Sequence, residues 1–248
     1  MGLDSVDVVL VRPARAANVA AACRALKNMG LRSVALVGAH PGGLDEPAAR
    51  ALAYGAWDVL DGIRRPGSLR EAVAGCAVVA GTSGRPHPAA WTPRRLAEEG
   101  LARAAGSRLA VVFGPEAEGL RNEELALCHV RVHIPSDPAQ HSLNLAQAVL
   151  LVAYELRLAV LTGTGDRGEP RPAAASAGEL EAALDAWRDA LLAVGYLNPA
   201  NPEAILAEAR ALLGRAGLTA REATLLRGMA RQILWAARRV APGSGEGA

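Results

Sequence analysis

The sequence predicts an α/β fold built around a mainly parallel sheet. Over the first 161 residues, short runs of continuous apolar and β-branched residues alternate with longer segments of helical periodicity. Parallel strands are covered on both faces by their connecting helices, so they read as uninterrupted apolar runs. The chain has 248 residues, 51% of them hydrophobic, which suits one domain of ordinary size and a smaller one.

Five segments have the composition of buried strands, and a sixth is weaker. The five are Val6–Val11, Ser33–Val37, 78–80, Leu109–Phe113 and 130–134, and the weaker segment is 58–60. Helices are expected between and after them, at 18–29, 46–54, 68–75, 92–105, 121–127 and 143–161. This order of elements is typical of a layered α/β domain.

The helix expected at 18–29 raises a question about its arginine. Asn18 has a side chain that can cap the start of this helix, and Gly30 can end it in the left-handed conformation. Most residues between them are alanines, which suit close packing, yet Arg24 stands in their midst. Taken alone, the stretch allows two interpretations of Arg24, a solvated or ion-paired surface residue or a functional group.

The composition changes after residue 161, and the domain boundaries follow from that change. We expect an α/β domain over residues 1–161 and a linker rich in Gly, Pro, Ser and Ala over 162–178. A helical extension is expected over 179–241 and a flexible tail over 242–248.

Three helices are expected in the extension. The first has one apolar face, formed by Leu180, Leu184, Trp187 and Leu191. The second is expected to begin at Asn201 and Pro202, a cap followed by a proline. The third is expected at Thr219, whose distance in sequence from Glu222 is that of a capping box.

Bulk properties exclude several classes of protein. The formal net charge is only +2, so the overall charge does not by itself indicate a nucleic-acid partner. The three cysteines form no C-x-x-C pair and the five histidines have no convincing ligand spacing, so we expect no metal site and no disulfide framework. The sequence has neither a signal peptide nor an uninterrupted apolar span, which predicts a cytoplasmic protein without a membrane segment.

Three irregular segments each follow an expected strand, and together they predict a ligand pocket. They are "GTSGR" at 81–85, "GPEAEGL" at 114–120 and "PSDPAQHSLN" at 135–144. In open parallel sheets ligands bind outside the carboxyl ends of strands, so these segments indicate a nucleotide-like ligand unless their glycines serve only turns. The match "GTGDRG" to a dinucleotide fingerprint, at 163–168, follows a helix instead of a strand, and we do not interpret it as a nucleotide site.

The same segments resemble the motifs of a known family. Asn18 with "AACRALKNMG", "VVFGPEAEGLRNEEL" and "IPSDPAQHSLNLAQAVLLVAYELR" resemble the three motifs of SPOUT-class, TrmH-type RNA 2′-O-ribose methyltransferases. The resemblance is closest to the TrmJ group, which methylates the ribose of nucleotide 32 in tRNA anticodon loops. It extends to "AWRDALLAVGYLNP" and "ATLLRGMARQIL" in the helical extension.

This resemblance implies a SPOUT fold, an α/β domain with a C-terminal deep trefoil knot, which is a rare exception to the rule against threaded chains. It further implies a homodimer that binds S-adenosylmethionine in the knot, near the subunit interface, and takes tRNA as its substrate. The positions that match cofactor contacts are Thr82, Ser83, Gly84, Gly114, Glu116, Ile134, His141, Ser142 and Leu143. At His141 we expect a backbone contact only, and Glu116 has the alternative of being an exposed loop glutamate.

Arg24 matches the catalytic arginine of the family, and Asn18, Ser142 and Asn144 match residues that position substrate or cofactor. Asn18 and Ser142 have the alternative of being plain helix caps. An arginine is charged at neutral pH, so Arg24 either helps to deprotonate the ribose 2′-hydroxyl or orients it and stabilises the developing alkoxide.

RNA contacts are expected from arginines, although surface arginines with no such role are the alternative. Arg85 is expected to contact a phosphate. In the extension, the arginines that could follow the RNA backbone are Arg210, Arg215, Arg221, Arg227, Arg231, Arg238 and Arg239.

Three other functions stay open. An rRNA ribose methyltransferase of the same superfamily would share the catalytic motifs. A non-catalytic RNA-binding protein could have kept the fold, although the presence of Arg24 with all three loops argues against this. A Rossmann-type nucleotide enzyme would have no knot.

Overall fold

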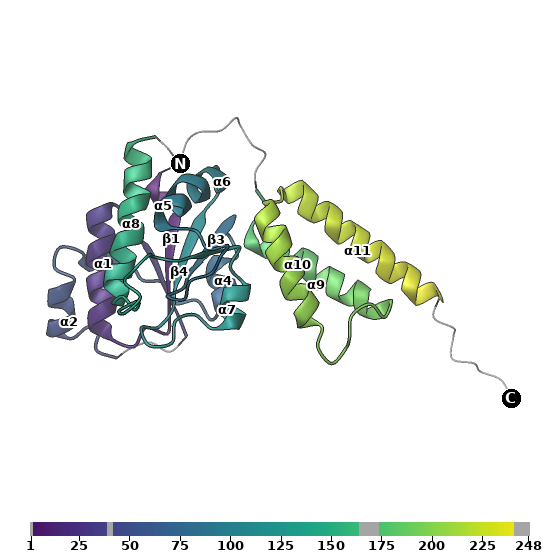
Figure 1. Ribbon diagram of the computed structural model, residues 1–248, viewed down its shortest axis with the longest axis horizontal. Coiled ribbons are helices and arrows are strands. Elements are labelled where there is room, and N and C mark those ends of the chain that lie inside the picture. Colours follow the sequence, from purple (N-terminus) through teal and green to yellow (C-terminus); the bar gives the residue numbers. More distant parts are fainter. Residues whose placement is uncertain (1, 39–41, 164–173, 241–248) are drawn as a thin grey trace.

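The computed structural model describes residues 2–38, 42–163 and 174–240, and Figure 1 shows how their elements are arranged. The centre is a parallel sheet, in the order β2-β1-β4-β3-β5. Its strands are β1 (Val6–Val11), β2 (Ser33–Val37), β3 (Val78–Thr82), β4 (Leu109–Phe113) and β5 (Val130–Val132). The sheet therefore confirms the predicted parallel α/β class, and its order differs from the 3-2-1-4-5-6 order of a Rossmann domain.

Helices cover both faces of the sheet. The described helices of this domain are η1 (Leu3–Ser5), α1 (Ala16–Met29), α2 (Pro47–Leu52), α3 (Trp57–Asp61), α4 (Leu69–Val73), α5 (Pro93–Arg95), the π-helical turn η2 (Leu96–Gly100), α6 (Leu101–Arg103), α7 (Asn122–Ala126) and α8 (Leu145–Leu161). Val8 and Leu10 point into the core shared with α1 and α8. Val9 and Val11 point into a second core with α4. Both cores are apolar, which explains why the strands show no polar alternation.

Several predicted elements differ in the structure. The weak strand expected at 58–60 is wrong, because these residues lie in α3, where a single helical turn buries Val59 and Leu60. The strand-like hydrogen bonds form farther along the chain, where Arg64 makes an isolated parallel bridge with Ala35 of β2. The Arg64 carbonyl accepts from the Leu36 N–H at 2.9 Å, and the Arg64 N–H donates to the Val34 carbonyl at 3.0 Å. The single helix expected at 92–105 is interrupted by η2. The last strand ends at Val132 instead of residue 134.

Helix α1 ends as predicted and buries several of its small residues, among them Ala20, Ala22 and Ala25. Gly30 has φ of 83° and donates its N–H to carbonyls of the last turn. The helix buries Val19, Cys23 and Leu26, and it packs along α8. Ala17, Arg24 and Asn28 are exposed on its other side. The alanines therefore serve close packing, and Arg24 projects away from the core.

The extension consists of α9 (Ala177–Ala193), α10 (Glu203–Ala216) and α11 (Ala220–Val240) in the described part of the chain. Leu180 and Leu184 are buried as the periodicity predicts, and the Trp187 indole donates to the Leu226 carbonyl of α11 at 3.0 Å. Thr219 and Glu222 form the expected capping box. The expected linker (162–178) lies mostly outside the described residues, and the tail (242–248) lies entirely outside them.

The extension packs against the start of β3 and β5. The backbone N–H groups of Ala177 and Gly178 donate to the carbonyls of Cys76 and Ala74, at 2.7 and 2.9 Å. A Cβ on Gly178 would stand 3.0 Å from the Ala74 oxygen, so only glycine allows this approach without a shift. Gly214 of α10 contacts His129, whose pKa is lowered to about 4 by burial.

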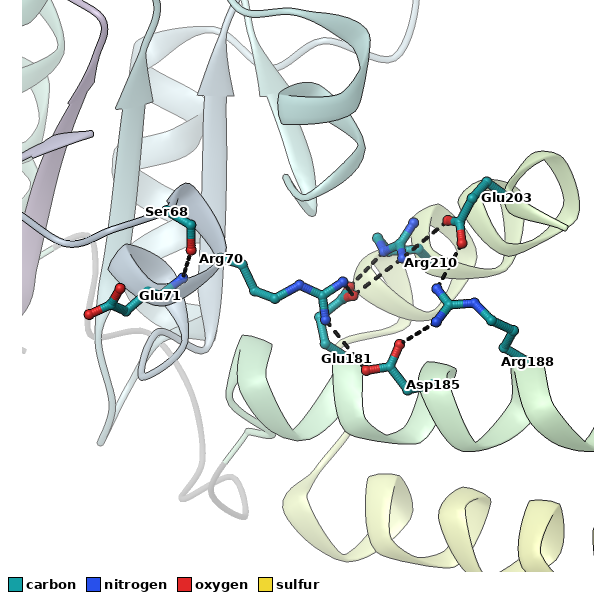
Figure 2. Close-up of polar contacts among 8 residues, drawn as sticks. All are labelled: Ser68, Arg70, Glu71, Glu181, Asp185, Arg188, Glu203 and Arg210. Carbon is teal, nitrogen blue, oxygen red and sulfur yellow. Dashed lines mark hydrogen bonds and ion pairs between the residues drawn. The ribbon is translucent and has the colours of Figure 1, made fainter. Parts of the chain in front are cut away.

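A group of charged side chains lies within the extension and reaches α4 (Figure 2). Arg210 donates to both carboxylate oxygens of Glu181, at 2.6 and 3.2 Å, and both residues are buried. Arg70 of α4 pairs with Glu181 at 2.9 Å and with Asp185 at 3.5 Å. Arg188 joins Asp185 to Glu203. The expectation that Arg210 contacts RNA is therefore wrong, because its guanidinium is enclosed and paired.

We predict that Glu181→Ala lowers the free energy of unfolding by about 3 kcal/mol, because it leaves the Arg210 guanidinium buried without its partner. Urea unfolding at neutral pH measures this loss. Asp61→Ala is the control, since it removes the partner of Arg50 in an exposed pair and should cost about 1 kcal/mol or less. Equal losses in the two variants would contradict a stabilising role for the buried pair.

Candidate active site

Three loops and the start of α1 meet at the carboxyl edge of the sheet. We call 81–85 the first loop, 114–120 the second and 134–144 the third. The first follows β3, the second follows β4 and the third follows β5, and β3 lies between the other two strands. The predicted ligand loops therefore leave the sheet at the same edge.

A chain of hydrogen bonds joins two of these loops to α1. The Asn144 amide donates to the Asn18 oxygen at 3.0 Å, and the Asn18 amide donates to the Glu116 carboxylate. The other Glu116 oxygen accepts from the Ala14 backbone at 3.1 Å. The structure thus brings together Asn18, Glu116 and Asn144, three of the residues that the sequence singled out.

The direction of this chain fixes the orientation of both amides. The Asn144 oxygen accepts from the Ala146 N–H at 2.9 Å, so its nitrogen must face Asn18. Burial alone would raise the pKa of Glu116, but hydrogen bonds from Asn18 and the Ala14 backbone outweigh this and lower it. Glu116 therefore carries a negative charge at neutral pH.

Two predicted caps are placed differently. Helix α1 begins at Ala16 with Arg15 at its cap position, so Asn18 lies in the first turn and is not a cap. Asn144, instead of Ser142, caps α8, and Gln147 completes the capping box. The Ser142 side chain is exposed and lies three residues before Leu145, the first residue of α8. Glu116 is half-buried and bonded, so it is not merely an exposed loop glutamate.

Side chains of the first loop bond within the protein. Thr82 donates its hydroxyl to the Val112 carbonyl at 3.0 Å. The Ser83 hydroxyl bonds to the backbone of Arg85, and His133 bonds through Nδ1 to the Ser83 carbonyl at 3.1 Å. These contacts hold the loop in one conformation, and the Arg85 side chain is left exposed.

Two predicted glycines have different structural reasons. A Cβ on Gly84 would make only an ordinary contact with the His141 ring, at 4.0 Å, so the first loop lies close to the third at this point. A Cβ on Gly114 would lie 2.3 Å from backbone atoms of Gly119 and Leu120. Gly114 is therefore required by the fold of the second loop itself. In the third loop, Ile134 packs against the core and Leu143 is half-buried.

Arg24 does not join this hydrogen-bond chain. Its guanidinium lies 6.0 Å from the centre of the Tyr54 ring, and among the described residues its side chain makes no hydrogen bond or ion pair. The sequence analysis did not single out Tyr54, which is 66% exposed and contacts Trp57 edge to face. An exposed aromatic beside the catalytic candidate was a signal that could have been noted.

Arg12 is a second residue that the sequence analysis missed. It has φ of 46° and forms an ion pair with Glu124 of α7, which fixes the chain segment after β1 against the helix that follows the second loop. Nothing in the local sequence distinguishes Arg12 from other loop arginines.

The described residues contain neither a metal-binding cluster nor a helix that could span a membrane. Within 2–38, 42–163 and 174–240, no group of three His, Cys, Asp or Glu residues is arranged to hold a metal ion. In the same residues, every helix is too short or too polar to cross a bilayer.

Comparison with known proteins identifies two matching family models. The SpoU rRNA Methylase family model matches residues 5–154. The model of the tRNA methyltransferase TrmJ C-terminal domain matches residues 178–242. Together the two models cover the α/β domain and the extension.

Individual relatives match along nearly the whole chain. The chain is 39% identical to the tRNA (cytidine/uridine/adenosine-2′-O-)-methyltransferase TrmJ of Pseudomonas aeruginosa, covering 92% of this chain and 93% of the relative. It is 37% identical to the tRNA (cytidine/uridine-2′-O-)-methyltransferase TrmJ of Escherichia coli K12, covering 93% and 96%. The crystal structure of TrmJ from Zymomonas mobilis ZM4 superposes with a TM-score of 0.77 at 33% identity, over 92% of this chain and 98% of that one.

We predict that Gly114→Ala destabilises the protein by about 2 kcal/mol and displaces the second loop, because the added Cβ overlaps the backbone at Gly119. Thermal or urea unfolding measures the loss. Gly84→Ala is the matched control, since its Cβ has room, and it should unfold like the wild type. Similar stability of the two variants would show that the second loop can rearrange freely.

Proposed function

The chain belongs to the SpoU rRNA Methylase family, and from this premise we propose that it methylates the 2′-hydroxyl of a ribose in tRNA, using S-adenosylmethionine. The observation that carries the proposal is the hydrogen-bonded chain Glu116–Asn18–Asn144, which assembles three motif segments at the carboxyl edge of the sheet. The relatives from Pseudomonas aeruginosa and Escherichia coli, named as tRNA 2′-O-methyltransferases, support the same activity.

The residues of the three loops fit S-adenosylmethionine. The first and third loops come close together at Gly84 and His141, while the hydroxyl groups of Thr82 and Ser83 in the first loop are already bonded within the protein, which leaves backbone groups to bind a ligand. Glu116 supplies a negative charge beside them, which suits a cationic ligand. We propose that backbone groups at Ile134, His141, Ser142 and Leu143, with the first loop and Gly114, hold the cofactor. When bound, it supplies the methyl group.

Arg24 acts on the ribose in this proposal. Its guanidinium donates hydrogen bonds to the 2′-oxygen and stabilises the negative charge that develops there. Asn18 and Asn144 hold the second and third loops in register with α1. The proton of the hydroxyl leaves to solvent or to a phosphate of the RNA, because no described carboxylate or histidine touches Arg24.

We further propose that the third loop threads the trefoil knot of the family. The support is the path of the chain. Strand β5 is at one edge of the sheet, yet α8, which follows the third loop, packs beside α1 near the other edge. To get there the chain passes the second loop, which it meets through Asn18.

A homodimer is the proposed assembly. Helix α8 exposes an apolar row formed by Leu150, Leu151, Tyr154 and Leu161. Helix α8 lies next to α1, on the side of the molecule away from the extension (Figure 1). A second copy covering α8 would bury the row and bring the Arg24 face of α1 toward the interface.

The proposed target is ribose 32 of the anticodon loop, with cytidine or uridine as its base, and the proposed location is the cytoplasm. The family resemblance and the matched TrmJ C-terminal domain support tRNA over rRNA. An rRNA target is the alternative that the assay must exclude.

We predict that the wild type transfers a labelled methyl group to unmodified tRNA and that Arg24→Ala lowers the rate about 100-fold or more while cofactor binding persists, because preorganised charge at the reacting oxygen is lost. Mapping the methylated nucleotide tests position 32. Arg32→Ala, which removes an exposed arginine paired with Asp58, is the control. Methylation of rRNA alone would overturn the substrate, and cofactor binding without transfer to either RNA would overturn the activity.

We predict that Leu151→Asp converts the dimer to a monomer, because it places a charge in the apolar row of α8. Sedimentation equilibrium measures the mass. Leu212→Asp is the matched control, since Leu212 is also an exposed leucine, at 59% against 43% for Leu151, but lies on α10. A monomeric wild type, or an unchanged mass of the α8 variant, would contradict the proposed interface.

A further inference from the structure

Tyr54 and Trp57 form an aromatic pair at the turn between α2 and α3, next to the proposed ribose site. Their ring centres lie 6.0 Å apart and the ring planes meet at 86°, which is an edge-to-face contact. Both side chains are exposed, so neither ring is part of the core. Helix α2 packs against α1, which carries Arg24 (Figure 1). The pair therefore needs an explanation other than packing in the core.

The backbone of this turn is fixed although the Tyr54 ring is exposed. Ala53 and Ala56, on either side of the turn, are buried, and the Ala56 N–H donates to the Ala53 carbonyl at 2.7 Å. Gly55 completes the turn with φ of 77°, a conformation that most residues disfavour. Ala53 belongs to the same core as the buried face of α1. Tyr54 is thus held at a defined position relative to that helix.

Trp57 fixes the Tyr54 ring from the side. Its indole N–H donates to the Arg50 carbonyl at 3.1 Å, which anchors the indole to α2. The Arg50 side chain is held in turn by Asp61 of α3, with 2.8 Å between Nη1 and Oδ1. A tyrosine ring has few rotamers, and an anchored neighbour in contact with it reduces their number further. The Tyr54 ring therefore offers a defined surface in spite of its exposure.

The Arg24 guanidinium is the group that meets this surface. Its central carbon lies over the Tyr54 ring, 6.0 Å from the ring centre, at the outer limit of a cation–π contact. Other arginines of the α/β domain have carboxylate partners, as Arg12 has Glu124. Among the residues that the structure describes, no carboxylate pairs with Arg24, and the Tyr54 ring is its side-chain neighbour.

This difference matters for a residue that must donate to a substrate oxygen. A carboxylate would accept from the N–H groups of Arg24 and compete with the ribose for them. An aromatic ring attracts the cation through its quadrupole, so the N–H groups stay available. Fixing a long side chain in advance also reduces the rotamer freedom that is lost when the substrate binds. A ring is thus a partner that can hold this arginine without blocking it.

We propose that Tyr54 is a positioning residue for methyl transfer: its ring, held by Trp57, keeps the Arg24 guanidinium where it donates to the ribose 2′-oxygen. The inference rests on the proposed function, in which Arg24 acts on the ribose. It deepens that function by assigning a role to a residue outside the three motif segments. The effect of Tyr54 on the reaction passes through Arg24.

Single-turnover methyl transfer to unmodified tRNA tests this role. The maximal rate constant, and the enzyme concentration that gives half of it, are measured for the wild type, Tyr54→Phe and Tyr54→Leu. The first variant keeps the ring without its hydroxyl, and the second keeps apolar bulk without a ring. Tyr196→Leu is the matched control, since Tyr196 is 65% exposed against 66% for Tyr54 but lies in the extension. Each change is also made in the Arg24→Ala background.

The expected result is that Tyr54→Leu lowers the maximal rate constant about 3- to 5-fold at an unchanged half-saturating concentration, because a cation–π contact at an exposed position is weak. Tyr54→Phe should keep the rate constant within about twofold of the wild type, since a phenyl ring attracts a cation as well. In the Arg24→Ala background, Tyr54→Leu should cost nothing further, because the group that it positions is gone. Tyr196→Leu should leave the rate constant unchanged.

Four outcomes overturn the inference. The first is a loss in Tyr54→Leu that persists in the Arg24→Ala background, and the second is an equal loss in Tyr54→Phe. The third is a rate constant of Tyr54→Leu equal to that of the wild type. The fourth is a higher half-saturating concentration at an unchanged rate constant, which would show that the ring binds RNA instead of positioning Arg24.

A measurement without RNA separates this inference from the proposed activity. In protein labelled with ¹⁵N-arginine, the Nε–Hε signal of Arg24 is assigned by its loss in Arg24→Ala. The ring current of Tyr54 should shift this signal, and the shift should disappear in Tyr54→Leu but persist in Tyr54→Phe. That pattern in a wild type that methylates neither tRNA nor rRNA would reject the proposed function and retain the contact. Methyl transfer without that pattern would retain the activity and overturn the positioning role.

Discussion

The candidate active site depends on one amide, that of Asn18, which is bonded on both sides. Its oxygen accepts from Asn144 and its nitrogen donates to Glu116, so it joins segments 126 and 98 residues away in the sequence. Asn144 in turn fixes the first turn of α8, and Glu116 fixes the second loop against the segment that enters α1. Loops usually vary in conformation. Here two of them are held to the end of one helix, so the pocket has a defined shape before a ligand arrives.

The extension and the three loops lie at opposite ends of the sheet. The extension contacts Ala74, Cys76 and His129, which precede β3 and β5, while the first and third loops lie at the opposite end of the same strands. The buried pair Glu181–Arg210 lies wholly inside the extension, and Arg70 is the charged residue through which α4 joins it. The helices of the extension therefore keep their own core while resting on the rigid base of the sheet.

Much of this arrangement was predictable from the sequence, for identifiable reasons. Strands β1 and β4 are buried on both faces and consist of apolar residues, apart from Asp7 in β1, and such runs have few alternative structures. The strand prediction at 58–60 failed because a segment this short, with two neighbouring apolar residues, fits one helical turn as well as a short strand. Asn18 was predicted as a cap because local sequence shows which groups can bond to a helix end, but not that a glutamate 98 residues away competes for them.

The same limit applies to Arg210 and Tyr54. Arg210 looks like other exposed arginines until Glu181 is placed beside it. Tyr54 lies beside Arg24 only in the folded chain. Motif resemblance singled out Asn18, Glu116 and Asn144, which the fold brings together, whereas the partners of individual side chains needed the structure.

The placement of the extension at the amino ends of β3 and β5 has a consequence for how such chains diversify. A module attached there can be exchanged, enlarged or lost without disturbing the contacts among Asn18, Glu116 and Asn144, because it shares no side chain with them. Docking surface and chemistry can then change at different rates within one gene. Recombination at this domain boundary would produce the observed pattern, in which residues 5–154 and 178–242 match two separate family models.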